Sequence, residues 1–326
     1  MAIVKRIKQA FQEFPEQADI VRLTYGGRKY LWMLDMAWSM VWYGARPIDY
    51  VRFEFHRKSG RERDRYLTIM RYFALLKKMR KEMGSSSNLS GRKSEEYKRF
   101  SKAINRSYMI VNYETKESDI RDFITKYGTV IAKPDNGEQG HGVIKIKSDD
   151  LKTIQFLLNE IRNNQYIIEE CLVNAPEISE INDTSLNTIR CYTLMDKDGN
   201  VHIMEIMLRV GLKGSVVDNW GSGGVGYCFD VNTGICCQCG LDKLNRPYTF
   251  HPGTNFKMIG FQLPNYDELK NYIVSLAKNL PEARYVGWDI AITPNGYELV
   301  EVNAPGGHDF LQAFGRPWGD FIKKYW

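Results

Sequence analysis

The chain has 326 residues, of which 43% are hydrophobic and 26% are charged, and its formal net charge is +6. These proportions are ordinary for a soluble globular protein and exclude a disordered chain or a long coiled coil. The length exceeds that of a typical single domain, so we expect two or three lobes.

Charge is concentrated in the first hundred residues, which carry 22 Lys and Arg against 11 Asp and Glu, a net charge of +11. The remaining residues carry 23 basic and 28 acidic side chains, a net charge of −5. A basic front region suggests an anionic partner such as a membrane surface or an acidic polysaccharide, or else a plain set of solvated helices. It has no recognisable nucleic-acid-binding motif, so nucleic acid is not expected as a partner.

Residues 1–83 are predicted to be mostly helical, with apolar side chains at helical spacing between Tyr66 and Met79. The most apolar stretch, residues 30–43, contains Asp35 and is too short to span a bilayer, which takes about 20 residues. The stretch carries three tryptophans: Trp32, Trp38 and Trp42. They suit either a membrane interface or, as we favour here, a buried helix face. No secretion signal is visible, and the cysteines lack zinc-site spacing, which together favour the reducing cytoplasm.

A polar linker at residues 84–88 marks the first predicted domain boundary. The predicted elements then follow as helix, strand, helix, strand, strand, helix and strand up to residue 170, an order typical of a small α+β lobe. Strands separated by hairpin turns dominate the rest of the chain. The sequence therefore predicts three parts: a basic helical region over 1–88, a small lobe over 89–170 and a large lobe over 171–326.

A glycine-rich loop joins two predicted strands of the small lobe, and Lys133 lies at the end of the strand before it. Because a strand rather than a helix follows, the loop does not match the Rossmann or Walker phosphate-binding patterns. A glycine-rich hairpin can instead close over a triphosphate with its backbone N–H groups, with the lysine on a phosphate oxygen. An ordinary flexible hairpin fits the pattern equally well. The glycines concerned are Gly137, Gly140 and Gly142.

Several later segments have residue types that suit a ligand site. A predicted strand end would offer backbone groups to adenine, and Glu177 after it would offer a carboxylate to ribose hydroxyls. Arg190 and Arg209 lie in otherwise apolar strands, where a guanidinium needs an anionic partner, either a ligand or a structural ion pair. A second glycine-rich loop carries Asn219, which would contact phosphate or metal or simply turn the chain. The strand end consists of Glu169, Glu170, Cys171 and Leu172.

The strongest signal is a predicted hairpin near the C-terminus, with a Pro-Asn-Gly turn at residues 294–296. Asp289 lies on its first strand, and Glu301 and Asn303 lie two residues apart on its second, so the last two point to one face. Two carboxylates and an amide oxygen are ligands of the kind that Mg²⁺ takes. An edge hairpin with solvated acids is the alternative.

The ordered set of these segments resembles the ATP-grasp superfamily, and in particular its sugar-transfer-associated branch, which resembles α-L-glutamate ligases. The likeness to the superfamily is carried by residues 130–134 with the glycine loop, 169–170, 187–190, 289 and 301–303. The likeness to the branch is carried by residues 208–211, 217–219, 223–224 and 302–306, with a leader at 49–50 and 53–55. The likeness as a whole covers roughly residues 95–326.

The resemblance implies an ATP-grasp fold, an α+β architecture in which two lobes hold ATP behind a helical N-terminal region. It implies a ligase that passes the γ-phosphate to a carboxylate, giving an acylphosphate that an amine attacks to form an amide. The residues it assigns to the nucleotide are Lys133, Gly137, Gly140, Gly142, Glu169, Glu170, Cys171, Leu172, Glu177 and Asn219. Those it assigns to Mg²⁺ are Asp289, Glu301 and Asn303, and those it assigns to charge stabilisation during the reaction are Arg190 and Arg209.

The branch is linked to surface polysaccharide biosynthesis. The resemblance therefore implies a cytoplasmic ligase that attaches an amino acid to a uronic acid of a capsule-type polysaccharide or its precursor. The basic front region would hold the anionic glycan or dock on the inner membrane. A non-catalytic nucleotide- or glycan-binding protein and a phosphotransferase on the same fold are the alternatives. The family's second phosphate-binding lysine would be Lys98 or Lys102, and His308 and Gln312 would contact the substrate.

Overall fold

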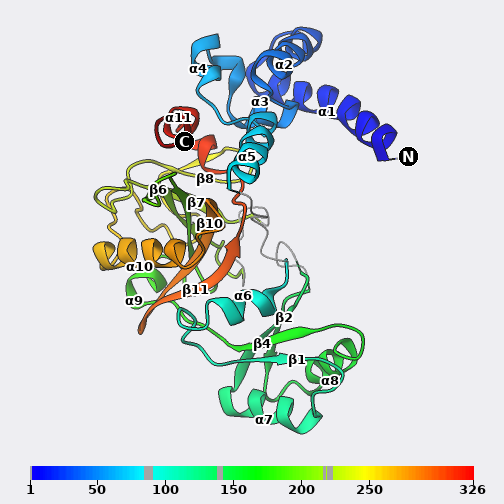
Figure 1. Ribbon diagram of the computed structural model, residues 1–326, viewed down its shortest axis with the longest axis vertical. Helices are drawn as coiled ribbons and strands as arrows, with labels where there is room; N and C mark the ends of the chain where they lie inside the picture. The colour runs from blue at the N-terminus through cyan, green and yellow to red at the C-terminus, as the bar shows by residue number, and fades with distance from the viewer. Residues whose placement is uncertain (1, 84–90, 138–141, 216–217, 219–222) are drawn as a thin grey trace.

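The computed structural model describes residues 2–83, 91–137, 142–215, 218 and 223–326. A helical N-terminal region, a large lobe and a small lobe follow one another along the longest axis of the molecule (Figure 1). Each lobe is built on one antiparallel sheet with helices packed against it. The predicted α+β class with a helical N-terminal region is therefore confirmed.

The N-terminal region closes around a core of aromatic side chains, among them Tyr50, Phe53 and Phe55. Its helices are α1 (Ala2–Tyr25), α2 (Lys29–Tyr43), α3 (Pro47–Arg52), α4 (Gly60–Asp64) and α5 (Ile69–Met83), with a 3-10 turn η1 (Phe55–Arg57). Helix α2 ends at Gly44, whose left-handed backbone lets its N–H reach the carbonyl of Met40. No helix among the described residues is long and apolar enough to cross a membrane.

The prediction of a buried tryptophan face on α2 is wrong. Trp38 is 56% exposed and Trp42 is 60% exposed. Helices α1 and α3 cover only the opposite side of α2, where Met36 and Ser39 are buried. Apolar residues at helical spacing indicate that a stripe exists, but they do not indicate which element covers it.

The small lobe is a four-stranded antiparallel sheet in the order β1-β4-β2-β3. Its elements are β1 (Tyr108–Val111), α7 (Glu117–Tyr127), β2 (Thr129–Pro134), β3 (Ile144–Lys147), α8 (Leu151–Glu160) and β4 (Tyr166–Glu170). Helices α7 and α8 lie on one face of the sheet, and their apolar sides form one core with it (Figure 1).

The large lobe is a seven-stranded sheet in the order β11-β10-β5-β6-β7-β8-β9. Its strands are β5 (Thr188–Met195), β6 (Val201–Val210), β7 (Val225–Phe229), β8 (Gly240–Leu241), β9 (Pro247–Tyr248), β10 (Tyr285–Thr293) and β11 (Gly296–Asn303). Its helical elements are α9 (Pro176–Ser179), α10 (Tyr266–Lys278), α11 (Gly319–Tyr325) and the 3-10 turn η3 (Leu311–Phe314).

The two faces of this sheet are covered by different parts of the chain. Helix α10 packs on the face that carries Ile189 and Cys191 of β5. Helix α5 and the C-terminal segment pack on the face that carries Tyr192 and Leu194. Because side chains alternate along a strand, Arg190 belongs to the second face, the one that the N-terminal region covers.

A short helix, α6 (Lys93–Arg99), connects the two lobes. Its Glu96 carboxylate accepts a hydrogen bond from the N–H of Val302 in the large lobe. Its Tyr97 hydroxyl donates to Glu169 in the small lobe. Because α6 contacts both sheets, the division of the chain at residues 88 and 170 stays a prediction.

Gln312 fixes the N-terminal region to the large lobe. Its side-chain oxygen accepts from the N–H groups of Leu67 and Trp318, each at 2.9 Å, and its side-chain nitrogen donates to the carbonyl of Leu67. His308 lies beside this joint, stacked on the ring of Tyr72 at 5.1 Å. Both residues are buried in contacts within the protein. That they contact the substrate stays a prediction.

Replacing Gln312 with leucine is expected to destabilise the protein, because the backbone groups of Leu67 and the N–H of Trp318 would remain buried without partners. We expect the free energy of unfolding to fall by roughly 2–4 kcal/mol in urea denaturation. The control is Gln155→Leu on the exposed side of α8, which should change it by less than about 0.5 kcal/mol. Equal stability of the two variants would show that the joint does not depend on this amide.

Candidate functional site

The candidate site is organised around the hairpin of β10 and β11. In their register Asp289 lies opposite Glu301, and Gly287 lies opposite Asn303. Opposite residues of an antiparallel pair share a face, as do alternate residues of one strand, so the three oxygen-bearing side chains project to one side of the sheet. On its other flank Asp289 lies opposite Arg190 of β5.

Asp289 is held by two guanidinium groups. Arg190 contacts both carboxylate oxygens, with Nη2 at 2.9 Å from Oδ2, and Arg209 Nη2 lies 3.2 Å from the same oxygen. The Asp289 side chain is 2% exposed. Burial alone would raise the pKa of this carboxyl, but the two arginines outweigh it and hold the pKa below its ordinary value. Asp289 is therefore ionised, and both arginines are fixed in direction.

Arg209 has further partners at the start of β5. Its Nη2 donates to the Thr188 hydroxyl at 2.5 Å, and its Nε lies 3.5 Å from Oδ2 of Asp218. The same Asp218 oxygen accepts the N–H of Thr188 at 2.9 Å. Arg190 and Arg209 each have a carboxylate partner within the protein. Of the two alternatives from the sequence, a ligand or a structural ion pair, the structure shows the ion pair.

The lysine nearest Glu301 is Lys93, which the sequence reasoning missed. Its Nζ lies 3.6 Å from Glu301 Oε1 and donates to the carbonyl of Gly137 at the start of the glycine-rich loop. Lys98 and Lys102, the predicted candidates, are exposed. Positions 93, 96 and 97 share one side of a helix, whereas position 98 points elsewhere. The helical spacing of Lys93 with the buried Tyr97 was the signal that could have identified it.

Glu96, one turn after Lys93, is a second missed carboxyl. One of its oxygens accepts the N–H of Val302 at 2.6 Å, between the predicted metal ligands Glu301 and Asn303. Burial, with a further contribution from the negative charge of Glu301, raises its pKa to about 8, although Lys93 and the Val302 N–H oppose the shift. Glu96 is therefore mainly protonated at neutral pH.

Lys133 and Glu169 belong to a buried ionic network between the lobes. Lys133 Nζ lies 2.5 Å from one oxygen of Glu169, and Arg106 Nε lies 2.8 Å from the other. Arg106 also contacts Glu298 of β11 at 3.1 Å, and Tyr97 donates its hydroxyl to Glu169. Burial would raise the pKa of Glu169, but Lys133 and Arg106 lower it to about 2. Arg106 lies in a loop before β1, and no pattern in the sequence distinguishes it.

Gly137 and Gly142 flank the glycine-rich loop, whereas Gly140 lies outside the described residues, as does Asn219 of the second loop. Gly142 has φ +75°, and a Cβ there would lie 2.8 Å from Cγ of Pro134, so the position requires glycine. Gly137 N–H donates to the carbonyl of Pro134 at 3.2 Å. The loop therefore begins and ends beside the end of β2, next to Lys133.

The predicted adenine segment leaves the small-lobe sheet at Glu170, the last residue of β4. The Glu170 carboxylate accepts a hydrogen bond from the N–H of Ser107 at 3.4 Å. Cys171 and Leu172 follow as partly buried chain outside the sheet. Glu177 is exposed in the first turn of α9. These residues lie on the segment that runs from the small lobe into the large one.

The donor set of the hairpin suits a hard cation. The buried Asn303 Nδ2 has no hydrogen-bond partner among the described residues. The described residues hold no cluster of three His, Cys, Asp or Glu arranged for a metal. An ion here would therefore take Asp289, Glu301 and the amide oxygen of Asn303, and would share both carboxylates with the neighbouring cations.

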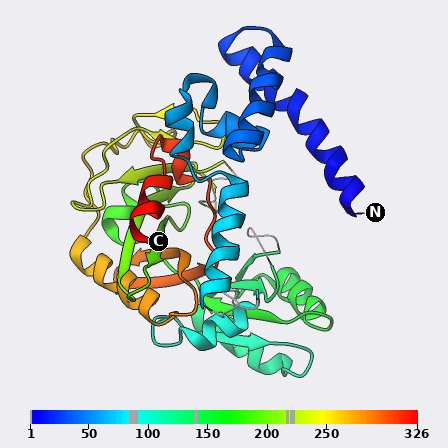
Figure 2. The same cartoon turned by 45° about the horizontal axis from the view of Figure 1, so that its top comes forward.

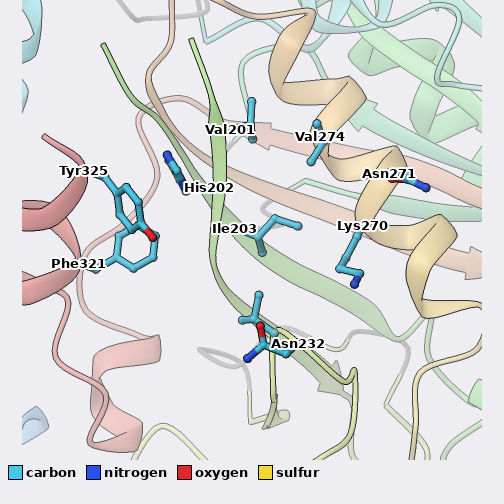
Figure 3. Close-up of a pocket in the computed structure, with 10 residues that line it drawn as sticks. Val201, His202, Ile203, Asn232, Lys270, Asn271, Val274, Phe321 and Tyr325 are labelled. Atoms are coloured by element: carbon cyan, nitrogen blue, oxygen red, sulfur yellow. The ribbon is translucent and has the colours of Figure 1, made fainter. Parts of the chain in front are cut away.

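A cavity of about 500 Å³ lies elsewhere in the large lobe, among the start of β6, α10 and α11 (Figure 3). His202, Lys270 and Tyr325 line it, and the His202 ring stacks on Tyr325 at 3.8 Å. None of the predicted site residues lines this cavity.

Comparison with protein families matches residues 98–315 to the family described as sugar-transfer associated ATP-grasp. This match covers two thirds of the chain. No curated protein matches it.

Similar solved structures include the ATP-grasp ligase PsnB complexed with minimal precursor, Mg and ADP, at 16% identity and a TM-score of 0.43. The match covers 72% of this chain and 57% of PsnB, so the chain spans little more than half the length of that relative. D-alanyl-alanine synthetase A from Vibrio cholerae O1 biovar eltor is 11% identical, with 71% and 61% of the two chains covered and a TM-score of 0.45.

Replacing Asp289 with asparagine is expected to destabilise the fold, because two guanidinium groups would remain buried beside an uncharged amide. Removing one partner of a buried ion pair costs about 3–5 kcal/mol, and urea denaturation would measure the loss. The control is Asp198→Asn in the exposed turn between β5 and β6, which should have little effect. Wild-type stability of Asp289→Asn would contradict a structural role for the carboxylate.

Glu96 is expected to make stability fall as pH rises. The unfolded carboxyl titrates near 4.5 and the folded one near 8. Between these values the folded state holds a proton that the unfolded state has lost, so stability is greatest below the lower value and is lost towards the upper one. The loss attributable to Glu96 is at most about 1.4 kcal/mol per pH unit.

The measurement is the free energy of unfolding across this pH interval for the wild type and for Glu96→Gln, which keeps an acceptor for the Val302 N–H. Comparing the two proteins removes the contributions of other groups, such as Glu205, whose pKa burial raises to about 7. Parallel curves for the two proteins would show that Glu96 titrates as in the unfolded chain.

Proposed function

The chain belongs to the sugar-transfer associated ATP-grasp family, and on this premise we propose that it uses ATP and Mg²⁺ to join a carboxylate to an amine. The main support is that Lys93 of α6 lies beside Glu301, which lies opposite Asp289 in the large-lobe sheet. Lys93 contacts Glu301 directly, and Glu96 lies close enough to both lysines and to Glu301 for their charges to affect its pKa. The junction of the lobes therefore brings together the cations that would bind phosphate and the oxygens that would bind the metal ion.

The triphosphate would lie along Lys93 and Lys133, beside the two ends of the glycine-rich loop at Gly137 and Gly142. Each ammonium group has three donors, and the contacts with Glu301 and Glu169 leave donors for phosphate oxygens. The backbone of Gly137 and Gly142 lies beside this position, and glycines allow close approach to a phosphate.

The base would be bound by backbone groups of Cys171 and Leu172. The carboxylate of Glu169 already accepts from Lys133, Arg106 and Tyr97, so it would orient Lys133 and not contact the base itself. Glu170 borders this segment. Glu177 is exposed at the start of α9 and would reach the ribose hydroxyls.

Asp289, Glu301 and Asn303 would hold Mg²⁺, which when bound neutralises charge on the phosphate oxygens that it contacts. Arg190 and Arg209 are directed by Asp289, so they need no reorganisation when negative charge develops on a substrate. The guanidinium groups would bind the transferring phosphoryl group and the oxyanion of the tetrahedral intermediate. Such fixed donors are each worth about 10²–10³ in rate.

The reaction balances as follows. A carboxylate oxygen of the substrate attacks the γ-phosphorus, and ADP leaves. The nitrogen of an uncharged amine then attacks the acyl carbon, inorganic phosphate leaves, and the amine loses a proton. The overall reaction yields an amide, ADP and phosphate.

For the substrates we propose an amino acid as the amine and a uronic acid of an anionic surface polysaccharide, or its lipid-linked precursor, as the carboxylate. The basic N-terminal region supports an anionic partner. In particular, α5 exposes Lys77, Arg80 and Lys81 while its other side packs on the sheet face that carries Arg190. We place the reaction in the cytoplasm, at the inner surface of the membrane where the precursor would be held.

The test pairs amino acids with uronic-acid glycans and measures ADP release together with the amide product. Lys93→Ala should lower turnover by at least about 10²-fold, because a phosphate oxygen loses its charged partner. The matched control is Lys98→Ala on the exposed side of the same helix, which should leave turnover unchanged. Hydroxylamine added in place of the amine should trap the acylphosphate as a hydroxamate.

Equal activity of the two lysine variants would contradict the phosphate site. A stable phosphorylated product without amide would identify a phosphotransferase. Nucleotide binding without ADP release under every substrate pair would identify a non-catalytic binding protein. Either of the last two results would overturn the ligase proposal.

A further inference from the structure

Helix α2 presents a continuous apolar surface to solvent. At about 100° per residue, its exposed positions between 30 and 42 fall within an arc of roughly 140°. The side chains there are Tyr30, Leu31, Leu34, Ala37, Trp38, Val41 and Trp42, which we call the α2 apolar face. All except Ala37 are large, and these six are between 50% and 79% exposed. None of the seven is charged.

This surface differs from the scattered exposed apolar residues found on any protein. Its members are contiguous on one helix, and the rings of Trp38 and Trp42 lie 5.2 Å apart. Asp35, which borders the arc, is partly buried and pairs with Arg63, so its charge is compensated. An exposed apolar patch of this kind marks an interaction site.

The charge of the surrounding region decides between partners. Residues 1–83 carry 18 Lys and Arg against 9 Asp and Glu, a net charge of +9. A second copy of the chain would bring two regions of the same sign together, which opposes self-association through this face. An anionic lipid surface has the complementary charge, and basic residues near such a surface are attracted to it.

Exposed basic groups lie near both ends of the face. Arg28 precedes α2, and its guanidinium contacts the Tyr30 hydroxyl at 3.1 Å. At the other end, the N–H of Met70 donates to the carbonyl of Gly44, so α5 starts where α2 stops. Met70 and Phe73 are also exposed, and Lys77 and Lys81 follow them along α5.

We propose that the α2 apolar face docks the protein on the surface of an anionic lipid bilayer. The helix has 15 residues and a length of about 22 Å, too short to span the roughly 30 Å hydrocarbon core, so it would lie in the interface. Tryptophan and tyrosine suit that position because their rings are apolar and carry one polar group. Tyr30, Trp38 and Trp42 supply these rings.

The bilayer would be the membrane partner of the proposed ligase, but the α2 apolar face lies in the N-terminal region and shares no residue with the proposed catalytic site. Vesicle binding and ligase activity can therefore fail separately. In Figure 1, α2 lies at the end of the molecule remote from the small lobe, and in Figure 2 the N-terminal region is at the top and the small lobe at the bottom, so docking through α2 leaves the junction of the lobes free.

The test uses the full chain and co-sedimentation with vesicles of phosphatidylcholine, with and without phosphatidylglycerol. We expect binding to the anionic vesicles, weaker binding to the neutral ones, and a loss as salt is raised. Leu34→Gln combined with Val41→Gln should lower the partition coefficient by on the order of tenfold, since both side chains would leave the interface. Both are exposed, so the fold should be retained.

The control variant combines Leu151→Gln with Phe156→Gln on α8, which removes two equally exposed apolar side chains from the small lobe. It should bind vesicles as the wild type does. Absence of wild-type binding to anionic vesicles would overturn the proposal, as would equal binding of the two double variants. A dimer lost only in the α2 variant, without vesicle binding, would assign the face to a second copy instead.

Discussion

The constraint on which the rest of the structure depends is the buried carboxylate of Asp289 between Arg190 and Arg209. Three charges removed from water are tolerable only when each is compensated, and the registers of β5, β6 and β10 provide this. An arginine within an apolar strand can be paired with a ligand or with a carboxylate of the protein, and here both arginines have a carboxylate of the protein. The guanidinium groups have structural partners, and in the proposed reaction the same partners would orient them toward the ligand.

The face of the sheet that carries this cluster is also the face that the N-terminal region covers. Tyr72 of α5 donates its hydroxyl to the carbonyl of Gly306, three residues after the end of β11. A Cβ at Gly306 would lie 2.9 Å from both the Gly287 nitrogen and the Tyr192 ring, so this segment packs directly on the sheet. The N-terminal region is therefore part of the wall beside the site, rather than an appended module.

Much of the candidate site follows from local rules in the sequence. Alternation along β11 puts Glu301 and Asn303 on one face, and the Pro-Asn-Gly turn brings Asp289 beside them. Lys93, Glu96 and Arg106 were missed because their partners in the large lobe are about 190–210 residues away in the chain, and local periodicity carries no information on such distant contacts. The tryptophan face was misassigned for the same reason, since only the tertiary structure shows which helices cover α2.

The α2 apolar face and the large lobe beside the proposed site are connected by α5. The helix begins next to Gly44 at the end of α2, and Tyr72, Leu75 and Met79 pack along the sheet of the large lobe. Its 15 residues span about 22 Å. Through Tyr72, which donates its hydroxyl to the carbonyl of Gly306, the same helix contacts the segment after β11. A protein docked through the α2 apolar face would therefore have its lipid contact and its proposed site connected by one helix that packs on the large lobe.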